Sequence, residues 1–240
     1  MTDEPYRWLE AVANRREYIR DQLKGATPVF AFSRPEGVLL FGVGTGQSKV
    51  FEIYDRQAFA ALGHPVDIEK VRQTTIEAAH LEGFTRAAED VTVRRLLSFS
   101  LSPALKTGFE QIFAAPLIVE SILAEVGVRA SDDVIARVGY DGTFRIETSG
   151  VAVAHTHAAD EAAAGAWLRK QLLPETSLSQ VVGFALAAWK QLTASAPFVA
   201  PTGPTDGPPV LEGKTTEIAL LHRSLPGRAR YRPLDPATLS

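Results

Sequence analysis

Cysteine is absent from the 240-residue chain. Its absence excludes disulfide frameworks, thiolate metal sites and cysteine nucleophiles, and it is typical of proteins of the reducing cytosol. A large excess of one charge is absent as well, because 25 lysines and arginines face 28 aspartates and glutamates, which leaves a net charge of −3. We therefore expect no nucleic-acid partner.

Long apolar runs are also missing, since no stretch approaches the roughly 18 residues of a membrane span. The N-terminal sequence MTDEPYRWLE is charged where a signal peptide needs its apolar centre. What is present is a globular composition, with 45% hydrophobic and 22% charged residues, which excludes a disordered or fibrous chain. We expect a soluble cytoplasmic protein with no membrane partner.

Residues 5–24 predict an amphipathic N-terminal helix. Pro5 suits the first turn, where its missing N–H costs nothing, and Gly25 is a plausible C-cap. Arg15 interrupts the apolar stripe, so this face suits a partly wet contact better than a deep core. The stripe itself has helical spacing and consists of Trp8, Val12, Ile19 and Leu23.

After this helix, strand runs alternate with pairs of helices. The predicted strands cover residues 28–33, 37–43, 49–55, 58–63, 117–127, 134–140, 143–148, 151–155, 216–223 and 228–234. The predicted helices cover residues 67–89, 91–113, 159–173 and 177–193. Pro103 is expected to kink or break the second of these helices. Residues 195–213 contain five prolines and predict an exposed loop.

This order favours two antiparallel sheets stacked face to face with helices outside, an α+β sandwich. The strands that precede the first helix pair need the later strands to complete their sheets. We therefore expect one domain over residues 1–240, with the helix at 5–24 appended to it.

GVGTGQSK (42–49) suggests a phosphate loop but lacks its essential features. A phosphate loop requires glycine directly before the lysine and a hydroxyl directly after it, whereas Ser48 precedes Lys49 and Val50 follows. The segment also enters a strand, so no helix N-terminus is available for a phosphate. We interpret it as a glycine-rich turn and expect no nucleotide cofactor.

Three further pairs of polar residues have ordinary explanations. His155 and His157 lack a third ligand nearby, so we interpret them as surface histidines and expect no metal. Asp132-Asp133 is typical of a turn. Thr215-Thr216 is followed by too few residues to form a catalytic body, and a threonine nucleophile needs a free amine as its base. The residues by themselves predict no catalytic site and no cofactor.

Several segments together resemble one known family. SKVFEIYDRQAFAALG (48–63), AAHLEGFTRAAEDVT (78–92), ILAEVG (122–127) and the final strand pair are similar to the α-type subunit of the actinobacterial-style proteasome core particle. The likeness spans most of residues 6–234, although the 195–213 loop looks like an insertion. It implies a four-layer αββα sandwich of the N-terminal nucleophile hydrolase type. It also implies a homoheptameric α-type ring stacked on catalytic β-type subunits.

The α and β types share this fold, so the catalytic residues distinguish them. A β-type subunit exposes a threonine after a glycine and uses an acidic residue and a lysine behind it. Gly25-Ala26-Thr27 lies at the corresponding junction, and Lys49 corresponds to that lysine. However, Ala26 has the best-aligned nucleophile position, and the acidic position falls on Gly42 or Val43. The resemblance therefore favours a non-catalytic α-type subunit; the alternative is a divergent self-compartmentalising threonine protease of β-like type.

The resemblance also implies where partners bind. Lys49 is expected to line a pocket between neighbouring subunits that receives the C-terminal carboxylate of a ring-shaped ATPase activator; the alternative interpretation is an exposed lysine at a strand start. The polar residues Met1, Thr2, Asp3, Glu4 and Pro5 are expected to narrow the axial entrance as a gate. The implied function is gated entry of substrates for protein degradation.

Overall fold

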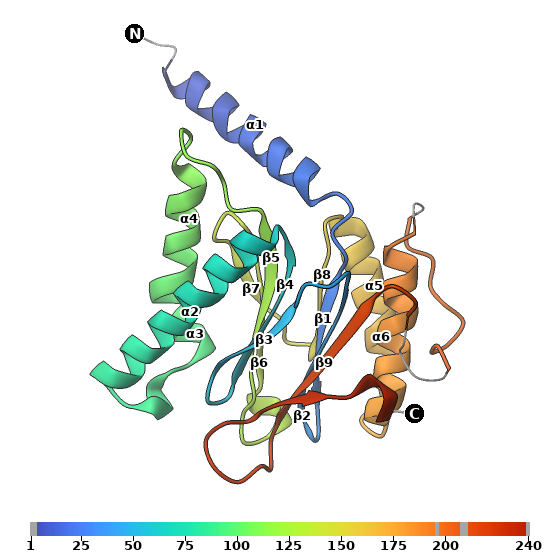
Figure 1. Cartoon of the computed structure of the whole chain (residues 1–240). Helices are drawn as coiled ribbons and strands as arrows, with labels where there is room; N and C mark the ends of the chain where they lie inside the picture. The colour runs from blue at the N-terminus through green and yellow to red at the C-terminus, as the bar shows by residue number, and fades with distance from the viewer. Residues whose placement is uncertain (1–3, 195–196, 207–210, 239–240) are drawn as a thin grey trace.

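The computed structural model describes residues 4–194, 197–206 and 211–238, and it confirms the expected order of strand runs and helix pairs (Figure 1). Ten strands form two antiparallel sheets within these residues. The first sheet has the order β10–β9–β2–β1–β8, with β1 (Val29–Arg34), β2 (Gly37–Gly44), β8 (Val151–Ala154), β9 (Thr215–His222) and β10 (Tyr231–Leu234). The second has the order β3–β4–β5–β6–β7, with β3 (Val50–Tyr54), β4 (Gln57–Gly63), β5 (Val119–Glu125), β6 (Val134–Val138) and β7 (Phe144–Ile146).

Helices lie on both sides of this pair of sheets (Figure 1). They are α1 (Glu4–Leu23), α2 (Pro65–Thr85), α3 (Val93–Leu96), α4 (Ser102–Glu110), α5 (Ala158–Gln171) and α6 (Leu178–Leu192). Helices α2 to α4 cover the second sheet, and α5 and α6 cover the first. None of the helices among the described residues is both long and apolar enough to cross a membrane.

Pro103 does not break its helix. A π-helical turn at Leu97–Leu101 joins α3 to α4, and Pro103 lies at the start of α4. Proline is tolerated in the first turn of a helix, where its missing N–H is not needed. The wider π turn thus lets the chain continue from α3 into α4 with proline in the first turn of the new segment.

Alternation along the strands sends neighbouring side chains to opposite faces of each sheet. Ala31 and Leu40 face the space between the sheets, whereas Phe30 and Phe41, their neighbours along the strands, face α5 and α6. Phe59 on β4 likewise faces the α2–α4 side. Successive residues of a strand point to opposite faces, so each strand supplies the inter-sheet core and one outer core at once. The two antiparallel sheets and their helices agree with the expected α+β class.

Arg15 fastens α1 to the domain. It is buried, with 8% of its surface exposed, although the stripe that it interrupts is partly exposed at Trp8. Its guanidinium donates to the backbone carbonyls of Gly108 (3.0 Å), Ile112 (3.4 Å) and Ala114 (2.8 Å), at and just after the end of α4. A cation suits this position because carbonyls at the end of a helix lack partners and carry partial negative charge.

Asp132 and Asp133 lie in a short 3-10 turn, in agreement with their interpretation as a turn pair, and Asp133 also belongs to a buried ion pair. Both carboxylate oxygens of Asp133 accept from Arg223, at 2.8 and 2.9 Å. Asp133 also accepts from the Ser33 hydroxyl at 2.6 Å and the Gly127 N–H at 2.8 Å. This cluster ties the β5–β6 connection to the β1–β2 hairpin and the end of β9.

The proline-rich segment 195–213 forms no helix or strand within its described residues, as expected. It is nevertheless attached to the helices of the first sheet. The N–H of Phe198 donates to Asp160 at 2.9 Å, and the N–H of Thr205 donates to the carbonyl of Gly183 at 3.0 Å. The described part of the loop therefore lies along α5 and α6.

Candidate functional site

Strand β9, which pairs with β2, positions the backbone of Lys49. Its backbone N–H donates to both carboxylate oxygens of Glu217 on β9, at 3.1 and 2.9 Å, and the N–H of Val50 donates to the same carboxylate at 3.0 Å. The pairing register places Glu217 opposite Gly42, which leaves room for the Lys49 stem beside it. The glycine-rich turn before Lys49 is thus fixed at its end by a carboxylate from β9.

The Lys49 ammonium points into a small cavity between the sheet ends. Its Nζ donates to the backbone carbonyl of Thr27 at 3.0 Å. The cavity has a volume of about 160 Å³, and we call it the Lys49 cavity. It is lined by Gly25, Ala26, Thr27, Val43, Gly44, Thr45, Gln47, Ser48, Lys49, Gly63, Ile68 and Lys214. The Lys49 side chain is only partly exposed, which argues against the alternative interpretation of an exposed lysine.

Burial makes the Lys49 ammonium easier to deprotonate. It lowers the pKa of the Lys49 ammonium to about 8, and the nearby negative charge of Glu217 opposes this shift. An ammonium offers three donors, and Thr27 accepts one hydrogen bond from it. A cation with remaining donors in a partly dry cavity can bind a carboxylate.

The same region does not assemble a threonine nucleophile. The Thr27 hydroxyl donates to the carbonyl of Val43 at 2.5 Å. Its amide is part of a continuous turn, in which the N–H of Ala26 donates to the carbonyl of Leu23 at 2.9 Å. The Thr27 hydroxyl is thus bonded to a backbone carbonyl, and the position of the acidic partner on β2 is held by Gly42 and Val43.

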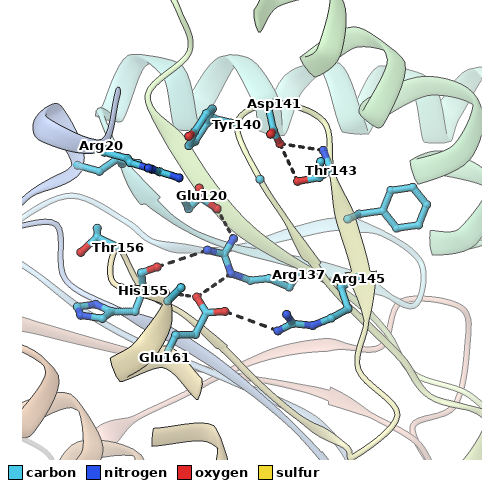
Figure 2. A pocket seen from close by; sticks show the side chains of 14 residues that line it. Arg20, Glu120, Arg137, Tyr140, Asp141, Thr143, Arg145, His155, Thr156 and Glu161 are labelled. Atoms are coloured by element: carbon cyan, nitrogen blue, oxygen red, sulfur yellow. Dashed lines mark hydrogen bonds and ion pairs between the residues drawn. The ribbon is translucent and has the colours of Figure 1, made fainter. Parts of the chain in front are cut away.

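A second cavity, of about 630 Å³, lies at the open edge of the sandwich beside β6, β7 and α5, and Figure 2 shows it. Its centre is Arg137, which bonds Glu120 and, at 3.2 Å, Glu161. Arg137 also donates to the backbone carbonyls of Val138 at 3.0 Å and His155 at 3.5 Å. Each of the three guanidinium nitrogens thus donates to the protein, and this cavity is centred on a structural ion network.

The two histidines differ. His155 is buried, so its interpretation as a surface histidine is wrong, and burial lowers its pKa to about 4. His157 has an exposed side chain 3.6 Å from Asp160, in agreement with that interpretation. Among the described residues, no group of three or more His, Cys, Asp or Glu side chains could hold a metal ion.

The gate prediction falls mostly outside the described part of the chain. Met1, Thr2 and Asp3 lie outside the described residues. Glu4 and Pro5 begin helix α1 and so do not precede it. The gate therefore stays a prediction.

The sequence interpretation missed Glu217 and Lys214. Glu217 lies on the same face of β9 as Ala219 and Leu221, which face the inter-sheet core. A carboxylate on an apolar stripe of a strand is a signal that could have identified it, because a buried carboxylate requires partners. Lys214 lies outside the strand pattern, and only the pairing of Thr215 with Gly44 brings it to the Lys49 cavity.

Comparison with curated proteins finds relatives that share one name, proteasome subunit alpha. The protein of Actinosynnema mirum is 30% identical over 234 residues, which cover 96% of this chain and 83% of the relative. That of Jonesia denitrificans is 30% identical over 225 residues, 93% of this chain and 89% of the relative. That of Streptomyces griseus is 33% identical over 146 residues, 60% of this chain and 54% of the relative. No protein-family model matches the chain.

Proposed function

The chain belongs to the proteasome subunit alpha family, and we propose that it forms the outer ring of a bacterial proteasome core particle. It is of the α type, the non-catalytic type of proteasome subunit, and it assembles with other proteasome subunits in protein degradation. The resemblance to an α-type subunit is thereby confirmed. The alternative of a β-like threonine protease has no support in these relatives or in the geometry at Thr27.

The proposed particle has a homoheptameric ring of this chain on a ring of catalytic β-type subunits, in the cytoplasm. Each subunit has the αββα layering of an N-terminal nucleophile hydrolase. Helix α1 is evidence for a ring, because its apolar stripe extends beyond the part of the helix that packs on the sandwich. Trp8 lies on the same face as the buried Ile19 yet is 46% exposed. A neighbouring copy would cover this part of the stripe. Residues 1–5 precede or begin α1 and form the gate.

The observation that carries the docking function is the Lys49 ammonium in its cavity. Lysine is a compact charge on a long stem, and it suits the capture of a terminal carboxylate. The Lys49 side chain is held by its hydrogen bond to Thr27, and the Lys49 backbone is held by its hydrogen bonds to Glu217. The lysine therefore loses less conformational entropy when a ligand binds. We infer that this cavity receives the C-terminal carboxylate of a ring-shaped ATPase activator.

The test is Lys49→Ala in the assembled particle with its β-type partner. A charge-assisted hydrogen bond contributes about 1.5–3 kcal/mol, and multivalent docking compounds its loss around the ring. We expect unchanged assembly and unchanged slow hydrolysis of small peptides, but loss of ATPase-stimulated degradation of folded substrates. Lys190→Ala, at an exposed position on α6, is the matched control. Wild-type stimulation in Lys49→Ala at low activator concentration would remove Lys49 from the docking site.

A further inference from the structure

Lys49 is set apart from the other lysines of the chain by its surroundings. All seven lysines lie within the described residues, and the other six have exposed side chains, whereas that of Lys49 is only partly exposed. Two of the exposed lysines also have carboxylate partners, because Lys24 pairs with Asp21 and Lys106 pairs with Glu110. Water and carboxylates both stabilise an ammonium, so exposed lysines are weak nucleophiles near neutral pH.

The Lys49 ammonium has little of this stabilisation. It carries three N–H groups, and among the described residues the acceptor within hydrogen-bond distance of it is the Thr27 carbonyl, at 3.0 Å. The carboxylate of Glu217 accepts instead from the backbone N–H groups of Lys49 and Val50. An ammonium that is withdrawn from water with one acceptor is destabilised relative to the neutral amine. The pKa of Lys49, lowered to about 8 by burial, agrees with this geometry.

The Lys49 cavity has room for a small group beside the amine. Its volume of about 160 Å³ is several times the roughly 30 Å³ that one water molecule occupies. Four of its lining residues, Gly25, Ala26, Gly44 and Gly63, have no side chain or only a methyl group. The neutral amine can therefore keep one N–H on the Thr27 carbonyl while its lone pair meets a small electrophile in this space.

We propose that Lys49 is a site of acylation by small acyl phosphates, and that the modification closes the Lys49 cavity to a carboxylate ligand. The neutral amine attacks the carbonyl carbon of the acyl phosphate, so that a C–N bond forms and the C–O bond to the phosphate breaks. The electron pair of that C–O bond leaves on the phosphate, which also takes up the amine proton. The product is an uncharged Nε-acyl-lysine whose acyl group occupies the cavity. The acylation is independent of the proposed function, and its effect on docking rests on that function.

Site-resolved acetylation of the purified full chain tests this proposal. The probe is acetyl phosphate at pH 7, and mass spectrometry of peptides follows the acetylated fraction at each lysine over time. The exposed Lys190 is the internal control. The same reaction in the urea-unfolded chain is the second control, because unfolding removes the surroundings of Lys49 without changing its sequence neighbours.

At pH 7 an amine with a pKa of about 8 is neutral about 300 times more often than an amine with the ordinary value of 10.5. A less basic amine is a weaker nucleophile, so we expect a smaller advantage, with Lys49 acetylated about tenfold faster than Lys190. In urea the two rates should become similar. Acetylation of Lys49 no faster than that of Lys190 in the folded chain, or an advantage that persists in urea, overturns the proposal.

A second measurement separates this inference from the proposed function. In the assembled particle, the loss of ATPase-stimulated degradation should follow the acetylated fraction at Lys49 during treatment with acetyl phosphate. If Lys49 is acetylated selectively while stimulation is unchanged, the modification stands and docking at Lys49 is wrong. If Lys49→Ala abolishes stimulation but acetylation shows no preference for Lys49, docking stands and this inference is wrong.

Discussion

Replacement of Lys49 by methionine should stabilise the isolated chain at neutral pH. Burial lowers the pKa of Lys49 to about 8 from the ordinary value of 10.5, a difference that corresponds to about 3 kcal/mol. Methionine fills a similar volume without the charge, but it leaves the Thr27 carbonyl without its donor, which costs about 1 kcal/mol. We therefore expect Lys49→Met to raise the free energy of unfolding by about 1–2 kcal/mol at pH 7.

The gain should also depend on pH in a defined direction. Below pH 8, Lys49 is charged in both the folded and unfolded states, so the full penalty is present. Between pH 8 and 10.5 the unfolded state binds more protons than the folded state, so wild type gains stability as the pH rises and the advantage of Lys49→Met disappears. Urea unfolding of wild type, Lys49→Met and the exposed control Lys190→Met across pH 7–10.5 measures this. A wild type more stable than Lys49→Met at pH 7, or a difference that does not change with pH, would refute the reasoning.

Three further predictions concern the ion network, the N-terminal helix and the gate. Arg137→Leu should destabilise the chain by about 3–5 kcal/mol in urea unfolding, because Glu120 stays buried without a cation and Glu161 keeps only Arg145, at 3.6 Å, whereas Arg145→Leu, at a side chain that is 66% exposed, should cost less than 1 kcal/mol. Arg15→Ala should increase amide hydrogen exchange in α1, whereas Arg16→Ala, next along the helix, should not; equal exchange in both variants contradicts the anchor. Deletion of residues 2–5 should speed peptide turnover by the assembled particle without a change in assembly, and unchanged turnover refutes the gate.

Much of the fold could be predicted because it depends on local patterns. The hairpin at Arg34–Gly37 and the alternation in β3 follow from turn chemistry and from period-2 spacing. The amphipathic stripe of α1 likewise predicts a helix that ends near Gly25. These patterns involve residues within a few positions of one another, so composition and spacing are enough to identify them.

The missed features depend on partners that are distant in sequence. Arg15 contacts carbonyls that are more than 90 residues away in the sequence. Asp133 and Arg223, which form an ion pair, are 90 residues apart in the sequence. Glu217 reaches the Lys49 backbone across 168 residues. Whether a charged side chain is exposed or buried is determined by such partners, and local sequence does not reveal them. The same limit applies to Lys49, which the family pattern identified, whereas its partner Glu217 on β9 was not identified.

The central claim is that this chain is the α-type ring subunit of a proteasome core particle. Native mass measurement of the chain produced with and without a proteasome β-type subunit tests it most directly. The account predicts a large complex that contains both chains, in which this chain retains the residues before Thr27. A chain that does not associate with the β-type subunit, or that loses those residues by self-cleavage, would contradict it.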